Sequence, residues 1–205
     1  MTLNKNYLLL FLLFIYTLIG IYLSLTTGIS HDEFHEQLNW EINIAAIKEF
    51  LLNGNFQKLL NYSDKYHGIG FHFVSQPIQV LISDFVSSYN ELSSYGGFLV
   101  SKHSVIFFIF SFSGIFFYLL CLKISKSVIF SFLSTSIYLL YPYLFGHAQI
   151  NPKDIPFLSI WTIVTYFFLN ILEDIYSEKK INKKAIIILS FFTAYLISIR
   201  ISGII

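Results

Sequence analysis

Residues 105–122 read VIFFIFSFSGIFFYLLCL, a run without a charged side chain. A helix needs about 20 mostly apolar residues to cross the roughly 30 Å hydrocarbon core of a bilayer. Four other runs are similarly apolar and carry at most one charge each, and the whole chain has 55% hydrophobic and only 12% charged residues. The sequence therefore predicts five membrane-spanning helices, at residues 7–26, 105–122, 128–145, 156–172 and 185–205.

These runs also exclude several classes of protein. The strands of a membrane β-barrel alternate in polarity, whereas these segments are apolar on every face. The formal net charge of +1 and the single arginine, Arg200, leave no basic patch, so we exclude nucleic acid as a partner. We expect an all-α, polytopic membrane helix bundle.

The lysines predict an orientation, because short loops rich in lysine mark the cytoplasmic side. If the spans alternate, residues 28–104 and 146–155 form the two outer loops. Seven lysines then lie on the inner side: Lys5, Lys123, Lys126, Lys179, Lys180, Lys183 and Lys184.

The long outer loop, residues 28–104, contains two helical patterns. Apolar residues recur at helical spacing within residues 34–52, and again from Val74 to Phe85. Both segments are short and amphipathic, as interfacial helices are. Two helices that pack on each other as a small cap would fit the same pattern.

Ser30-His31-Asp32-Glu33 directly follows the first span. One interpretation is a capping box, in which Ser30 and Glu33 bond each other's backbone. Another is that the adjacent carboxylates hold a divalent cation, with Asp154 if a metal is present, or act as a base. His31 and His35 are spaced as in a zinc hydrolase, although Asp32 stands where that motif has Glu.

The short outer loop places Lys153 and Asp154 at the outer membrane edge. Pro152 in this loop and Pro156 at the first position of the next span suit an ordinary hairpin between spans. A lysine at this position is also a natural partner for a lipid phosphate.

The same loop resembles a signature of a known family. Residues 145–147 read FGH and residues 151–157 read NPKDIPF, which is similar to a signature of bacterial polytopic glycosyltransferases of the GT-C superfamily. These enzymes are relatives of the protein O-mannosyltransferases and the lipid A aminoarabinose transferases. Further similar elements are Asp32-Glu33, Tyr66-His67-Gly68, Lys102-His103 and residues 198–203. The resemblance covers residues 1–205, which would be the N-terminal part of a longer enzyme.

The resemblance implies transfer of a sugar from a polyprenyl-phosphate carrier to a glycan, lipid or protein acceptor. The membrane would be the bacterial inner (plasma) membrane, with the active site facing outward. Asp32 is the expected base, with Glu33 as its neighbour in the catalytic pair. Residues expected to bind the lipid phosphate or the substrate are Lys153, Asp154, Arg200, His147, His103 and Tyr66.

Arg200 also stands out without the resemblance, because an arginine inside a span costs free energy unless it faces a cavity or a partner. A transporter or a non-enzymatic scaffold subunit would explain the spans and Arg200 equally well. The sugar, the acceptor and any metal requirement are not encoded in a recognisable pattern.

Overall fold

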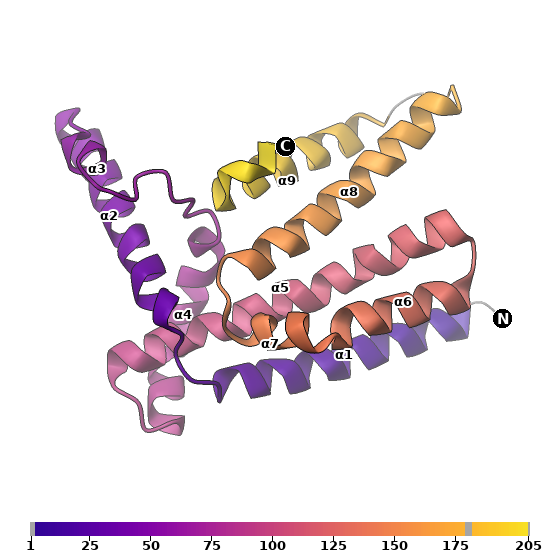
Figure 1. Ribbon diagram of the computed structural model, residues 1–205, viewed down its shortest axis with the longest axis horizontal. Coiled ribbons are helices and arrows are strands. Elements are labelled where there is room, and N and C mark those ends of the chain that lie inside the picture. Colours follow the sequence, from indigo (N-terminus) through magenta and orange to yellow (C-terminus); the bar gives the residue numbers. More distant parts are fainter. Residues whose placement is uncertain (1–2, 179–181, 205) are drawn as a thin grey trace.

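The computed structural model describes residues 3–178 and 182–204, and all regular structure in these ranges is helical (Figure 1). The expected all-α class is confirmed. In chain order the elements are α1 (Leu3–Leu25), α2 (His31–Asn53), α3 (Gln57–Leu60), α4 (His72–Tyr89), α5 (Ser94–Ser125), α6 (Val128–Leu140), α7 (Pro142–Ile150), α8 (Asp154–Tyr176), α9 (Lys183–Ile199) and the 3-10 helix η1 (Ile201–Ile204).

Two helices of the described chain, α5 and α8, are long and apolar enough to cross a membrane. The number rises to three if α6 and α7 form one broken span, bent by 53°. The described apolar part of α1, Leu9–Leu25, is shorter than a span, and α9 has 17 residues. The fold is thus consistent with a membrane protein of two to three spans, and five spans are not confirmed.

The expected spans at residues 128–145 and 185–205 need correction. The first is not one straight helix, because Pro142 disfavours helical geometry at Tyr141, where α6 ends. The second ends at Ile199, and Arg200 has an extended backbone beyond the helix. Ile205, Lys179 and Lys180 lie outside the described residues.

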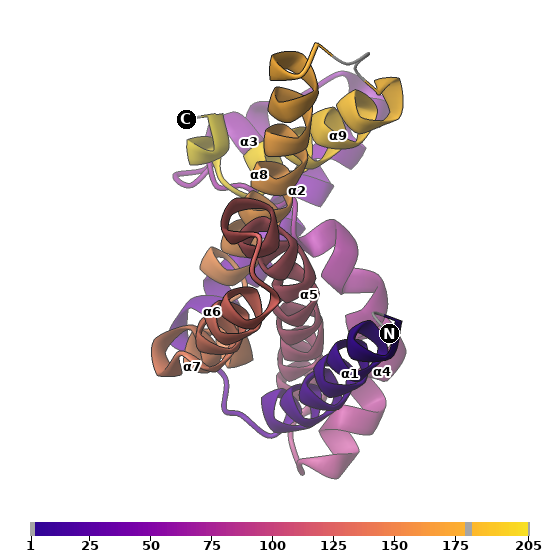
Figure 2. The same cartoon turned by 90° about the vertical axis from the view of Figure 1, so that its right-hand side faces the viewer.

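The long helix α5 is the centre of the bundle. Figure 1 shows α1, α6 and α8 running lengthwise beside it, and Figure 2 shows the same helices around α5 from one end. Phe107 and Phe110 of α5 are fully buried in the core. The approach of α1 is close, since a Cβ on Gly20 would lie 1.8 Å from the ring of Phe107.

The two helices expected in the long outer loop are present as α2 and α4. They touch through Gln76 Nε2, which donates to Gln37 Oε1 at 3.1 Å, and through the stacked rings of Trp40 and His72. The apolar stripe of α4 faces outward, whereas its polar Gln79 turns inward and donates to the carbonyl of Phe98 at 2.9 Å. The exposed stripe comprises Val74, Ile78, Leu81 and Phe85.

Candidate functional site

The start of α2 turns its two neighbouring carboxylates in different directions. Glu33 is fully buried; its Oε1 accepts from the backbone N–H of Ser30 at 2.7 Å, which is one half of the expected capping box. Asp32 is exposed, and its carboxylate forms no hydrogen bond or ion pair with the described residues. Successive helical residues point about 100° apart, so only Asp32 is accessible to a ligand from outside.

The second carboxylate oxygen of Glu33 contacts His103 of α5. Its Oε2 lies 2.9 Å from Nε2 of His103, and Nδ1 of His103 lies 3.0 Å from the carbonyl oxygen of Ser24 at the end of α1. Both side chains are 0% exposed. The contact therefore joins three helices, and it assigns both oxygens of Glu33 to protein partners.

Lys102, the residue before His103, is fully buried, and its Nζ has no hydrogen-bond partner among the described residues. A buried ammonium without a partner is costly unless an anion or a hydrogen-bond acceptor reaches it. This cation is the strongest sign of a ligand in the described chain.

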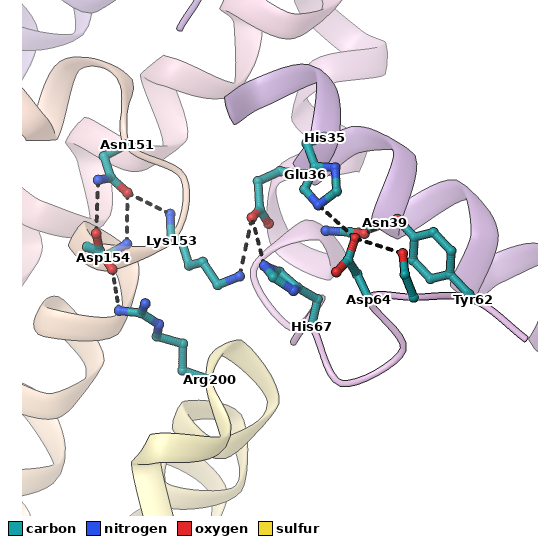
Figure 3. A network of polar contacts seen from close by, with 11 residues as sticks. His35, Glu36, Asn39, Tyr62, Asp64, His67, Asn151, Lys153, Asp154 and Arg200 are labelled. Carbon is teal, nitrogen blue, oxygen red and sulfur yellow. Dashed lines mark hydrogen bonds and ion pairs between the residues drawn. The ribbon is translucent and has the colours of Figure 1, made fainter. Parts of the chain in front are cut away.

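Glu36, one turn after Glu33, links the two outer loops (Figure 3). Its Oε1 lies 3.2 Å from Nζ of Lys153 and 3.6 Å from Nε2 of His67. The short outer loop therefore approaches the long one at Glu36, rather than at Asp32 or Glu33. Glu36 was not among the site residues predicted from the sequence, although its three-residue spacing from Glu33 places both on one side of a helix.

Asn151 organises the short outer loop. Its Oδ1 accepts from the backbone N–H groups of Lys153 at 3.1 Å and Asp154 at 2.8 Å. Its Nδ2 lies 3.1 Å from Nδ1 of His147 and donates to Asp154 Oδ2 at 3.2 Å. The other oxygen of Asp154 accepts from the guanidinium of Arg200, as Figure 3 shows. Four of the expected phosphate-binding residues, His147, Lys153, Asp154 and Arg200, thus lie near one another.

The loop before α4 packs directly on the end of α9. The backbone N–H of Gly70 donates to the carbonyl of Ser198 at 2.9 Å. A Cβ on Gly68 would lie 2.2 Å from the carbonyl oxygen of Ile199, so only glycine allows this approach. Two of the segments that carry the family resemblance, at residues 66–68 and 198–203, therefore meet at one end of the bundle, although they are more than 100 residues apart in the sequence.

The remaining expected residues lie at the edge of this cluster. Tyr66 is 79% exposed, with Nζ of Lys65 5.6 Å from its ring centre. Nε2 of His35 contacts Asp64 Oδ2 at 3.2 Å, and its ring lies edge-on to that of His67. Within the described ranges, no group of three His, Cys, Asp or Glu side chains is placed to hold a metal ion. The arrangement offers no zinc site at His31 and His35.

The pKa of His72 depends on its burial and on the charges around it. Burial, followed by the nearby cations Lys102 and Lys153, holds the pKa of His72 far below its ordinary value. The imidazole is therefore neutral, and its Nδ1 has no hydrogen-bond partner among the described residues. Lys102 and Lys153 thus bring positive charge close to His72, while the carboxylates of Glu33, Glu36 and Glu41 act on Lys102 from the same region.

An apolar groove of about 420 Å³ lies elsewhere, between α1, α5 and α6. Its described lining is mostly aliphatic, with Tyr16, Tyr118, Thr135 and Ser136 as members that carry a hydroxyl, and it includes none of the charged residues discussed above.

We compared the chain with protein-family models, with characterised proteins and with solved structures, and none of them matches it. The class of the protein is therefore described from its own fold and side chains. Over the described residues its regular structure is all helical, two to three of the helices are suited to a membrane, and one end of the bundle carries a cluster of charged side chains.

Proposed function

We propose that the protein belongs to a membrane glycosyltransferase of the GT-C type, which moves a sugar from a polyprenyl-phosphate carrier to an acceptor. The observation that carries this proposal is the convergence of the loop at residues 66–70, the short loop at residues 151–154, and residues 198–200. These three segments are separate in sequence, and each contains part of the resemblance to the family.

The charges of this cluster suit a phosphate. Lys102 is buried without a partner, and Lys153 and Arg200 reach the same end of the bundle on neighbouring elements. Cations that are already in place stabilise negative charge as it develops on a leaving group, without reorganisation during the reaction. Lys153 and Arg200 would neutralise the lipid phosphate as the bond to the sugar breaks.

Asp32 is the best candidate for the base that takes the proton of the acceptor hydroxyl. Its carboxylate is exposed and forms no contact that a substrate would have to break. A general base must come within hydrogen-bond reach of the proton that it removes. Glu33 supports the start of α2 and has no such access in this arrangement.

The membrane placement is part of the proposal. The charged end of the bundle would face outward across a bacterial inner (plasma) membrane, with α1 and α9 completing five spans. The uncharged, exposed stripe of α4 supports an interfacial position, because an apolar helix face gains free energy in the headgroup region.

The test is sugar transfer from a polyprenyl-phosphate sugar by membranes that contain the protein. Asp32→Asn keeps the size and capping ability of the side chain and removes its basicity, so we expect a loss on the order of 10²-fold or more. Ser30→Ala is the control, expected to cost about 1 kcal/mol of stability with transfer largely retained. Near-normal transfer by Asp32→Asn would remove Asp32 from the mechanism, and no transfer by the unmodified protein would overturn the proposal.

A further inference from the structure

The buried contact between Glu33 and His103 allows the protons to be counted. A carbonyl oxygen has only lone pairs, so Nδ1 of His103, 3.0 Å from the carbonyl oxygen of Ser24, must carry a hydrogen and donate it. In a neutral imidazole the other nitrogen, Nε2, then presents a lone pair. This lone pair would face Oε2 of Glu33 at 2.9 Å.

Two lone pairs at this distance repel each other, so one further proton is required. It lies either on His103, as an imidazolium beside a carboxylate, or on Glu33, as a carboxylic acid beside a neutral imidazole. Both arrangements contain one shared proton and have no net charge. We infer that Glu33 and His103 together form a binding site for a single proton, and that this protonated pair positions α2 on α1 and α5.

The burial of the pair explains why the proton is held. Both side chains are 0% exposed, and removal of the proton would leave a negative charge out of contact with water. Because the protonated pair is neutral, the carboxylates whose negative charge acts on the buried Lys102 are those of Glu36 and Glu41. The pair places α2, while Lys102 is a buried cation without a hydrogen-bond partner among the described residues.

Positioning by the pair extends along α2. Glu33 precedes Glu36 by one turn, and Glu36 meets Lys153 of the other outer loop at 3.2 Å. Fixing Glu33 therefore fixes the direction in which Asp32 and Glu36 point. This inference depends on the geometry of α1, α2 and α5 alone, and it would hold whatever reaction the protein performs.

Glutamine at position 33 is a matched probe of this hydrogen-bond pattern. In Glu33→Gln, the amide oxygen can accept from the N–H of Ser30, and the amide NH2 can donate to the lone pair on Nε2 of His103. This variant reproduces the protonated pair without an exchangeable carboxyl proton. Glu33→Leu has similar volume and can make neither bond.

The experiment is NMR on the full chain in lipid nanodiscs, with 15N-labelled histidine and 13C-labelled glutamate carboxyl groups. In the unmodified protein we expect Nδ1 of His103 to be protonated, and one proton in total on Nε2 of His103 and the carboxyl of Glu33. Glu33→Gln assigns both signals, because it removes the carboxyl resonance and leaves His103 neutral with its proton on Nδ1. A neutral imidazole beside an ionised Glu33, two protons in the pair, or a proton-free Nδ1 would each overturn the inference.

Thermal unfolding of the two variants tests the positioning role. Glu33→Gln should unfold close to the temperature of the unmodified protein, and Glu33→Leu should unfold at a clearly lower one or fail to accumulate in the folded state. If Glu33→Gln is as destabilised as Glu33→Leu, or if Glu33→Leu is as stable as the unmodified protein, the pair does not position α2 as inferred.

Discussion

Two pairs of charged side chains join elements at the end of the bundle that carries the charged cluster, and they differ in their access to water. The side chains of Glu33 and His103 are 0% exposed, whereas those of Asp154 and Arg200 are 56% and 44% exposed. Breaking a buried pair leaves an uncompensated charge and typically costs about 3–5 kcal/mol. Exposed pairs contribute about 0–1 kcal/mol, because water screens them.

This difference in exposure separates a pair that stabilises the fold from a pair that a ligand can reach. The buried pair, Glu33 and His103, is closed to a ligand and stabilises the packing of the helices that it joins. The exposed pair can open at little cost, so Arg200 can exchange Asp154 for an incoming anion. Lys153 lies between these extremes, since its side chain is 17% exposed and its partner Glu36 is 9% exposed.

The largest expected effect is on the buried pair. His103→Ala leaves the carboxyl of Glu33 buried without its partner, so we expect a loss of about 3–5 kcal/mol in the free energy of unfolding. The measurement is denaturant unfolding in detergent micelles. His31→Ala, at an exposed position of α2, is the control and should stay within about 0.5 kcal/mol of the unmodified protein. Equal effects at the two positions would contradict the comparison.

His72 sharpens the comparison, because it is a buried histidine without a carboxylate partner. Its pKa is lowered in the folded state, so below pH 6.5 the unfolded chain binds a proton that the folded chain does not. Stability should therefore fall as pH falls below about 6.5, by up to about 1.4 kcal/mol per pH unit from this group. Unfolding curves at several pH values measure the slope. His72→Gln should reduce it, and an unchanged slope would show that His72 is not its source.

The contact between Gly70 and α9 tests what holds Arg200 in place. A Cβ at position 70 would lie 2.0 Å from Oγ of Ser198 and 2.8 Å from its backbone carbon, so Gly70→Ala must push the loop away. We expect a loss of about 1–3 kcal/mol in unfolding free energy, as in other overpacked sites. Gly28→Ala has open space around its Cβ and is the matched control. A neutral Gly70→Ala would mean that this contact does not anchor the end of α9.

The smallest expected effect on stability is at the exposed pair. Arg200→Met should change the free energy of unfolding by less than about 1 kcal/mol, and high salt should reduce the difference. Thermal unfolding at low and high ionic strength provides the measurement. A loss as large as that of His103→Ala would show that the two pairs are energetically alike.

Several features followed from local sequence alone. Continuous apolar runs predicted the long helices, because a buried or lipid-facing helix needs no polar face. Helical spacing of apolar residues located α2 and α4, and the serine and glutamate at positions 30 and 33 predicted the contact that begins α2. The break at Tyr141 was not predicted, although a proline at position 142 restricts the residue before it.

Other features depend on contacts between distant segments. Asp32 and Glu33 are chemically alike and adjacent, and no local pattern says that Glu33 alone meets a histidine 70 residues away. The pairing of Glu36 with Lys153, across 117 positions, likewise requires the packed helices.

The sequence by itself therefore determined which segments are helical and which residues can carry charge chemistry, because helix periodicity and apolar length are local properties. Only the tertiary structure decided which charges are buried, which are exposed and which lack a partner. Burial and pairing result from the meeting of separate helices, and these two properties set the cost of each charge and its availability to a ligand.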